Sequence, residues 1–178
     1  MPTTFILSRH GHNFDPTDIT LRMGSQTDLS LSSTGRDAAD ALGRTLASRG
    51  FAPPSAVYVS PLIRTQETAT RALTSAGVTN PPALQILSEF NEINYGEDDG
   101  KPEEALIARI GKDAIDAWER NGIMPPEWSP KPDVIIQHLR AVFTRLAAAN
   151  TPDQHQTDWG FSSGGIIRFC PTRVWPTS

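Results

Sequence analysis

The sequence is poor in cysteine, in long apolar runs and in basic residues, and each shortage excludes a class of protein. Its one cysteine is Cys170, so no disulfide can form within the chain, and a reducing compartment such as the cytoplasm is expected. No apolar run approaches the roughly 18 residues of a membrane-spanning helix, and no early basic segment leads into an apolar one. We therefore expect a cytoplasmic protein that does not act at a membrane.

Positive charge is also scarce. The 16 lysines and arginines are outnumbered by 20 aspartates and glutamates, which gives a net charge of -4 and a pI of about 5.5. This balance argues against a nucleic-acid surface as the main binding site, although it allows a local basic pocket. No internal repeat or long block of like charge divides the chain. A length of 178 residues favours a single domain over residues 1–178.

Four short apolar segments alternate with helical patterns, which is typical of an α/β fold with a largely parallel sheet. The predicted strands are residues 5–7, 56–59, 84–87 and 159–162. A capping box at residues 34–37 predicts the first helix, which should bury Ala38, Leu42 and Leu46. Ser60-Pro61 is typical of a helix start, Pro102 should open one helix through residue 118, and Asp133 another.

The first predicted strand runs directly into Arg9-His10-Gly11. Ligands of an open α/β sheet bind at the carboxyl ends of its strands. The planar donor fork of an arginine suits phosphate oxygens, and a neutral histidine is a nucleophile toward phosphorus. The tripeptide predicts a phosphate site, but it arises by chance in many proteins and needs support from the rest of the chain.

Two further segments follow strand ends in the same way. Arg64 falls in the first turn of the helix after the second strand, where the helix N-terminus favours anions. On spacing alone, a solvent-facing arginine paired with Glu67 or Glu104 is favoured over an anion-binding one. Two carboxylates, Glu89 and Glu92, follow the third strand, and either is a candidate for proton transfer.

Taken together, these motifs resemble those of the histidine phosphatase superfamily, also called the phosphoglycerate mutase-like family. The resemblance covers about residues 4–168. It implies a three-layer sandwich with a mostly parallel sheet flanked by helices, and residues 97–132 as an insertion that covers the pocket. The matching positions are Arg9-His10-Gly11 and Asn13; Gly24, Asp28, Leu31 and Gly35; Ser60, Arg64-Thr65 and Thr68-Ala69; and Glu92-Ile93-Asn94-Tyr95-Gly96 with Gly100.

The resemblance implies a two-step phosphoryl transfer without a metal or cofactor. His10 would become a phosphohistidine, and Glu92, favoured over Glu89 by the motif, would protonate the leaving oxygen and then activate water. Arg9 and Arg64 would hold the phosphoryl oxygens, and Asn13 would orient one of them. The expected partner is a small phosphorylated molecule or a phosphoprotein, bound by a monomer or a dimer. Inorganic phosphate or sulfate should also fit the pocket.

The fourth family motif departs from the pattern. Where the family has Ser-His-Gly-Gly, this chain has Ser162-Ser163-Gly164-Gly165, so Ser163 stands where the second histidine is expected. We expect Ser163 and Gly164 to bind substrate, but a serine cannot carry positive charge. Losing such a donor typically costs about a hundred- to a thousandfold in rate. A weakened phosphatase and a non-catalytic protein that binds a phosphorylated ligand or partner therefore both stay open. Asp98, where many members have tryptophan, predicts a more acidic pocket mouth.

Three other functions fit the sequence less well. Residues 160–164 match the Gly-x-Ser-x-Gly pattern of the α/β-hydrolases, but that class needs a histidine later in the chain and none follows. The four histidines show no convincing metal-ligand spacing. A sugar-phosphate mutase is disfavoured because mutases that resemble this chain carry a longer insertion between the acid motif and the fourth motif.

Overall fold

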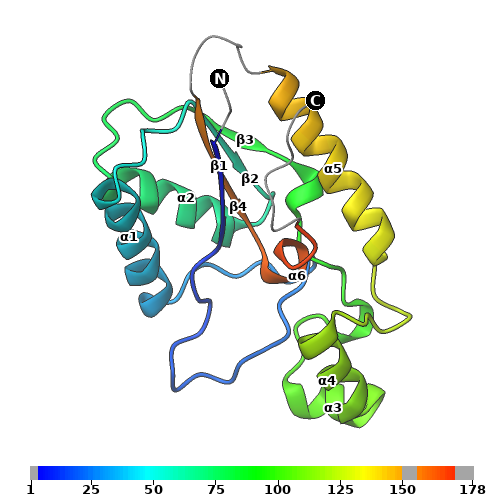
Figure 1. Cartoon of the computed structure of the whole chain (residues 1–178). Coiled ribbons are helices and arrows are strands. Elements are labelled where there is room, and N and C mark those ends of the chain that lie inside the picture. The colour runs from blue at the N-terminus through cyan, green and yellow to red at the C-terminus, as the bar shows by residue number, and fades with distance from the viewer. Residues whose placement is uncertain (1–3, 150–155, 171–178) are drawn as a thin grey trace.

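A computed structural model describes residues 4–149 and 156–170 as a parallel sheet between two helical layers (Figure 1). The strands lie in the order β1 (Thr4–Arg9), β4 (Thr157–Ser162), β2 (Ala56–Val59) and β3 (Leu84–Ile86), and every neighbouring pair is parallel. This confirms the predicted α/β fold. All four strands therefore end at the same edge of the sheet, where the sequence motifs are expected to meet.

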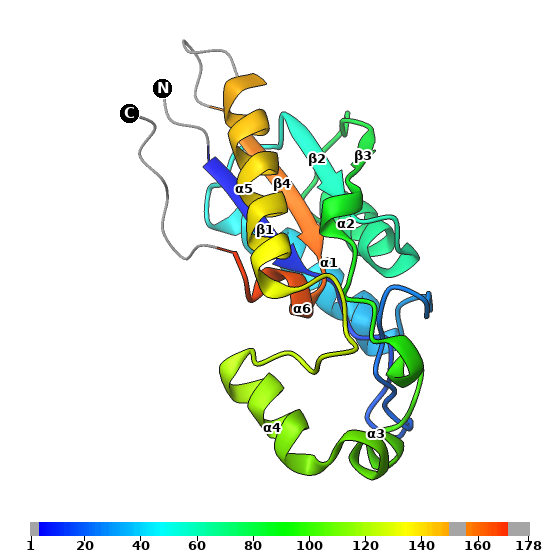
Figure 2. The same ribbon diagram turned by 90° about the vertical axis from the view of Figure 1, so that its right-hand side faces the viewer.

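Side-chain alternation along the strands supplies the two cores of the domain. Val57 and Val59 of β2, together with Trp159 and Phe161 of β4, pack toward α1 (Ser33–Ser48) and α2 (Ile63–Ser75). Tyr58 points to the opposite face, which is covered by α5 (Pro132–Ala149) and α6 (Gly164–Ile167). Figures 1 and 2 show α1 and α2 on one side of the sheet and α5 on the other.

The first helix differs from the prediction in its start and in its buried face. Its N-cap is Ser32, whose hydroxyl accepts a hydrogen bond from the backbone N–H of Gly35 at 3.1 Å. Ala38 is exposed, whereas Ala39 and Gly43 are buried. Gly43 lies so close to the α2 backbone that a methyl group there would overlap the carbonyl oxygen of Ala72. Two helices that lie this close need small residues between them. A search for apolar residues at helical spacing does not predict where those small residues are.

The helix predicted to begin at Pro102 is two helices. Gly111, with φ of 82°, separates α3 (Glu103–Ile110) from α4 (Lys112–Asn121). Both lie beyond the carboxyl edge of the sheet, away from the two flanking layers (Figure 2). Two short 3-10 helices, η1 (Ser88–Phe90) and η2 (Gly96–Asp98), lead from β3 to them. Helix α2 begins at Ile63, slightly later than predicted, and its N-cap position is Leu62.

Asp98 anchors this region rather than making the cavity acidic. Its side chain is 1% exposed, and it accepts hydrogen bonds from Arg109 Nε at 2.7 Å, from Arg109 Nη2 and from Trp128 Nε1 at 2.8 Å. Burial alone raises the pKa of Asp98, but these hydrogen bonds outweigh it and hold the pKa below its usual value. The expectation that Asp98 makes the pocket mouth more acidic was wrong, because this carboxylate is neutralised inside the fold.

Candidate active site

A cavity of about 990 Å³ opens at the carboxyl ends of the strands, where Arg9, His10 and Glu92 meet. One side, here called the strand-end wall, consists of Arg9, His10, Glu92, Gly164 and Gly165. The opposite side, the helical wall, consists of Glu103, Glu104, Leu106, Trp118 and Glu119 from α3 and α4. The rest is lined by residues of the 13–23 loop together with His12, Thr34, Tyr95 and Arg168. The volume leaves room for a sizeable leaving group beside a phosphoryl group.

His10 is held as a neutral imidazole with one unprotonated nitrogen. Its Nδ1 lies 2.6 Å from the carbonyl oxygen of Gly11, which can only accept, so Nδ1 carries the proton. Nε2 therefore accepts a hydrogen bond, from Arg64 Nε at 3.2 Å. The pKa of His10 is lowered to about 3, mainly by burial, and the nearby charge of Arg64 adds to this effect. The unprotonated Nε2 is the nitrogen available as a nucleophile.

The loop that carries His10 is locked by close backbone contacts. The backbone N–H of Gly11 donates to Thr68 Oγ1 at 3.0 Å. A methyl group on Gly11 would overlap the carbonyl oxygen of Gly35, and one on Gly35 would overlap the carbonyl oxygen of His12. Both glycines are required because the start of α1 presses directly against the loop. These contacts explain why glycine is found at both positions 11 and 35.

Arg64 is completely buried behind His10, so the solvent-facing alternative was wrong. Besides His10 Nε2, its guanidinium donates to the carbonyl oxygens of Thr27 at 2.9 Å and Gly24 at 3.1 Å. The loop that supplies these carbonyls is itself held by Asp99, which accepts from the backbone N–H of Gly24 at 3.0 Å. Arg64 thus joins α2, the loop and His10, and it lies behind the cavity surface.

Glu92 faces the same cavity as a buried carboxyl group that is 7% exposed. It accepts hydrogen bonds from the backbone N–H groups of Ile93 at 2.8 Å and Gly165 at 3.2 Å. Burial raises the pKa of Glu92, against the opposing effect of these hydrogen bonds. A carboxyl group with a raised pKa can hold and release a proton. Glu89, the other candidate acid, does not line this cavity, and it forms an ion pair with Arg145 at 3.5 Å.

Ser163 follows β4 directly beside the loop that carries His10. The register pairs Arg9 with Ser162, and the backbone N–H of His10 donates to the carbonyl oxygen of Ser162 at 3.0 Å. The Ser163 side chain is fully buried, and its hydroxyl has no hydrogen-bond partner within the described residues. The next residue, Gly164, lines the cavity beneath the Arg9 side chain, where a methyl group would lie 3.3 Å from Arg9 Nε.

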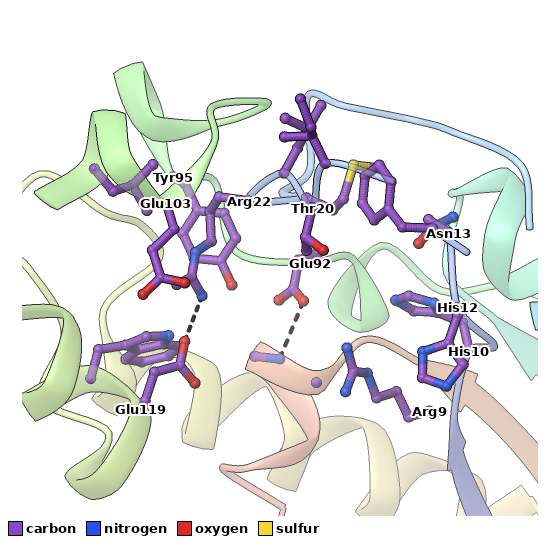
Figure 3. A pocket seen from close by; sticks show the side chains of 18 of the residues that line it. Arg9, His10, His12, Asn13, Thr20, Arg22, Glu92, Tyr95, Glu103 and Glu119 are labelled. Atoms are coloured by element: carbon purple, nitrogen blue, oxygen red, sulfur yellow. Dashed lines mark hydrogen bonds and ion pairs between the residues drawn. The ribbon is translucent and has the colours of Figure 1, made fainter. Parts of the chain in front are cut away.

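The side chain of Asn13 is bonded to the protein backbone, whereas that of His12 reaches into the cavity. Asn13 lines the cavity, but its side-chain N–H groups donate to the carbonyl oxygens of Leu29 at 3.0 Å and Ser30 at 2.9 Å. His12 extends an exposed imidazole into the cavity beside His10 (Figure 3). The alternation of two histidines around a glycine is the one sequence signal that points to His12.

Two arginines that the sequence analysis missed gather around Glu119 at the far end of the cavity. Arg22 Nη1 donates to Glu119 at 2.7 Å, and its guanidinium lies 5.6 Å from the ring centre of Tyr95 (Figure 3). Arg168 lies 4.0 Å above the Trp118 ring and 3.7 Å from Glu119. No sequence signal could find this cluster, because its members come from four separate segments.

Two kinds of feature are absent from the described part of the chain. No helix among residues 4–149 and 156–170 has the length and apolar character needed to cross a membrane. Within the same residues, no group of three or more histidine, cysteine, aspartate or glutamate side chains could hold a metal ion.

The chain is similar to proteins of one known family. Residues 5–174 match the family model described as histidine phosphatase superfamily (branch 1). Over 125 residues the chain is 34% identical to a 2,3-bisphosphoglycerate-dependent phosphoglycerate mutase of Clavibacter michiganensis, covering 70% of this chain and 48% of that protein. This chain therefore spans about half the length of that curated relative.

Solved structures show the same fold at low sequence identity. A phosphoglycerate mutase from Bacillus anthracis aligns with a TM-score of 0.76 and 18% identity, over 94% of this chain and 77% of that one. A mycobacterial glucosyl-3-phosphoglycerate phosphatase aligns with a TM-score of 0.72 and 20% identity, over 93% of this chain and 76% of that one. At these identities the likeness establishes the fold alone.

Proposed function

The chain belongs to the histidine phosphatase superfamily, and from this premise we propose that it hydrolyses a phosphomonoester through a phosphohistidine at His10. The observation that carries the proposal is the pairing of two groups across one cavity. His10 offers an unprotonated Nε2, and Glu92 offers a buried carboxyl group with a raised pKa (Figure 3). A nucleophile and a proton donor of matched protonation are what the transfer of a phosphoryl group to nitrogen requires.

The proposed reaction has two balanced steps. In the first, the Nε2 lone pair of His10 forms a bond to phosphorus, the ester P–O bond breaks, and the leaving oxygen takes the proton of Glu92. In the second, the Glu92 carboxylate takes a proton from water, the water oxygen attacks phosphorus, and the P–N bond breaks. The electron pair returns to Nε2, and inorganic phosphate leaves.

Charge on the phosphoryl oxygens would be met by Arg9 on the strand-end wall and by Arg64 from behind His10. Arg64 now donates to His10 Nε2, so its Nε–H must pass to a phosphoryl oxygen as phosphorus approaches. Asn13 would orient a phosphate oxygen only after releasing one of its two carbonyl partners. We assign Ser163 to the position of the second family histidine, where its hydroxyl would give one neutral hydrogen bond, next to Gly164.

We expect the substrate to be a small phosphorylated molecule or a phosphoprotein in the cytoplasm. The cavity of about 990 Å³ supports a leaving group larger than a few atoms. The mycobacterial glucosyl-3-phosphoglycerate phosphatase has been solved in complex with inorganic phosphate and with VO3, which supports the use of these anions as probes here.

A second function, binding of a phosphorylated ligand without turnover, is favoured by one observation. The neutral Ser163 hydroxyl, buried and unpartnered within the described residues, can accept or donate a hydrogen bond but supplies no charge to the transition state. A mutase activity is a third candidate, because the curated relatives are mutases. It predicts phosphoryl transfer to 3-phosphoglycerate in place of release to water.

The deciding experiment measures phosphate release from an aryl phosphate by this chain and by the variants His10→Ala, Ser163→His and His138→Ala. His138 is exposed and does not line the cavity, so its variant is the matched histidine control. We expect activity to vanish in His10→Ala, to rise in Ser163→His and to stay unchanged in His138→Ala. An acid-labile, base-stable phosphoenzyme that is missing from His10→Ala would identify the phosphohistidine.

No turnover above the His10→Ala background would refute hydrolysis of generic esters. Inorganic phosphate or vanadate binding would then support the non-catalytic function. A third assay supplies 2,3-bisphosphoglycerate and 3-phosphoglycerate, and label exchange between them that exceeds phosphate release would favour the mutase.

A further inference from the structure

We propose that His12 is a second substrate-contacting histidine, which donates an imidazole N–H to a non-bridging oxygen of the phosphoryl group that His10 attacks. This inference deepens the proposed function and rests on it. The first observation is position. His10 and His12 lie on the same side of the cavity, and Figure 3 shows both rings beside the Arg9 guanidinium, facing the space in front of Glu92.

The backbone of His12 is fixed although its side chain is exposed. Its carbonyl oxygen accepts hydrogen bonds from the backbone N–H of Ser32 at 2.9 Å and from Ser32 Oγ at 3.3 Å. The same oxygen lies so close to Gly35 that no side chain fits there. The start of α1 therefore fixes the backbone carbonyl of His12. A donor carried on a rigid backbone can be placed accurately enough to recognise a small anion.

The second observation is the shortage of other free donors around His10 Nε2. The phosphoryl group presents three non-bridging oxygens, whose charge must be met by N–H or O–H groups. Both terminal nitrogens of Arg64 already donate to the carbonyl oxygens of Gly24 and Thr27. The side-chain N–H groups of Asn13 likewise donate to two other carbonyl oxygens. Ser163 contributes a single hydroxyl.

His12 is uncommitted by comparison. Within the described residues, its imidazole has no hydrogen-bond partner, and it projects into the cavity. It is also close enough to act electrostatically on the nucleophile. After burial and the charges of Arg64 and Arg9, His12 is among the groups that lower the pKa of His10. Together with Arg9, His12 therefore supplies hydrogen-bond donors for the phosphoryl oxygens, because the donors of Arg64 and Asn13 are already bonded within the protein.

Two variants separate a hydrogen bond from mere bulk. His12→Ala removes the donor, and His12→Gln keeps an N–H at similar reach. Because a hydrogen bond to a charged group is strong, we expect His12→Ala to weaken binding of inorganic phosphate and vanadate by about ten- to a hundredfold. His12→Gln should recover most of this loss. His138→Ala should leave affinity unchanged, and thermal unfolding should confirm that each variant is folded.

A double-mutant cycle with Ser163→His sharpens the test. If His12 supplies a contact that Ser163 cannot, then an imidazole at position 163 makes His12 less important, and the losses in kcat/KM are not additive. We expect His12→Ala to cost about ten- to a hundredfold in this chain and several-fold less in the Ser163→His background. Equal losses in both backgrounds would contradict the compensation.

The two proposals fail in different ways. Phosphate affinity that is indifferent to His12→Ala, or that falls equally in His12→Gln, overturns the role of His12 even if turnover depends on His10. Absence of turnover in every variant overturns the hydrolase. His12-dependent phosphate binding would then still support the contact at this site.

Discussion

The two walls of the cavity are built by different means. On the strand-end wall, Glu92 is almost fully buried, and Arg64 and Ser163 behind it are completely buried. Gly11 and Gly35 bring the His10 loop and the start of α1 into backbone contact on this side. On the helical wall, Glu103 and Glu104 are exposed, and Glu119 is held by a partly exposed ion pair with Arg22.

This difference suggests that the two walls have different roles, one in the reaction and the other in substrate binding. The strand-end wall can keep reacting groups in unusual protonation states, because burial excludes water and backbone contacts prevent relaxation. The carboxylates of the helical wall are exposed to solvent, so they can influence which ester enters but cannot alter the chemistry strongly. Changes on the strand-end wall should therefore lower kcat, whereas changes on the helical wall should affect KM. Five experiments, in order of decreasing effect, test this comparison.

Replacing Glu92, the proposed proton donor, should have the largest effect. We expect Glu92→Gln to lower kcat by about a hundred- to a thousandfold for esters with a poor leaving group. The loss should be much smaller for an ester whose leaving group needs no proton. Steady-state kinetics over a series of aryl and alkyl phosphates measures this dependence. An equal loss across the series would show that Glu92 does not donate the proton.

The same variant tests the raised pKa of Glu92. A pKa above the unfolded value means that the fold favours the protonated form, so the free energy of unfolding should fall as the pH rises from the unfolded pKa through the folded one. Glu92→Gln should remove this decline. Denaturant unfolding at several pH values measures it, and an unchanged slope would contradict the role of burial.

Adjacent glycines on the strand-end wall give a matched pair. A methyl group at Gly165 would overlap the Glu92 carboxylate, so Gly165→Ala should cost about 1 to 3 kcal/mol and lower kcat by displacing that group. At Gly164 the nearest atom is the movable Arg9 Nε at 3.3 Å, so Gly164→Ala should be milder. Thermal unfolding and kinetics on both variants decide the point. The reverse order would refute the packing argument.

Asp98, which anchors the region of the helical wall, should matter for stability and for KM. In Asp98→Asn the buried carboxylate charge that meets Arg109 and Trp128 is lost. Because Arg109 is partly exposed, we expect a cost of about 1 to 2 kcal/mol, a raised KM and a nearly unchanged kcat. Asp116→Asn, on the exposed surface of α4, is the control and should change neither. A fall in kcat alone would contradict the division between the walls.

The smallest effect concerns substrate charge. Glu103 and Glu104 line the cavity without an ion pair among the described residues. We expect the double variant Glu103→Gln, Glu104→Gln to lower KM a few-fold for a phosphate ester that also bears a carboxylate, relative to a neutral aryl phosphate. The difference should disappear at high ionic strength, because solvent-exposed charges are screened beyond about 10 Å at 0.1 M salt. A difference that persists in salt would point to a direct contact.

The parts that the sequence predicted correctly share one property: each depends on neighbours along the chain. Strand β2 was predicted at its observed bounds, and the parallel α/β fold followed from the alternation of strands and helices. The wrong predictions concern contacts between distant segments. Ala38 fits an apolar helix pattern, but the close approach of α2 turns Ala39 inward instead. Asp98 is acidic in sequence, but Arg109 and Trp128 bury and neutralise it.

The candidate site divides in the same way. The motifs around His10, Arg64 and Glu92 were readable because parallel strands deliver their carboxyl ends to one edge, whatever lies between them. The catalytic assignments themselves stay predictions. The donors that Asn13 and Arg64 have already committed, and the exposed imidazole of His12, could not be read from the chain. They depend on which carbonyl oxygens lie within hydrogen-bond reach after folding.

The sequence by itself determined the family, the sheet and the order of the reactive groups, since these follow from local periodicity and from short motifs at strand ends. Only the tertiary structure decided which nitrogen of His10 is free, that the Glu92 carboxyl is buried enough to have a raised pKa, and that Arg22 and Arg168 share Glu119. Protonation and ion pairing depend on desolvation and on distances of a few ångströms, and those are set when separate segments pack against one another.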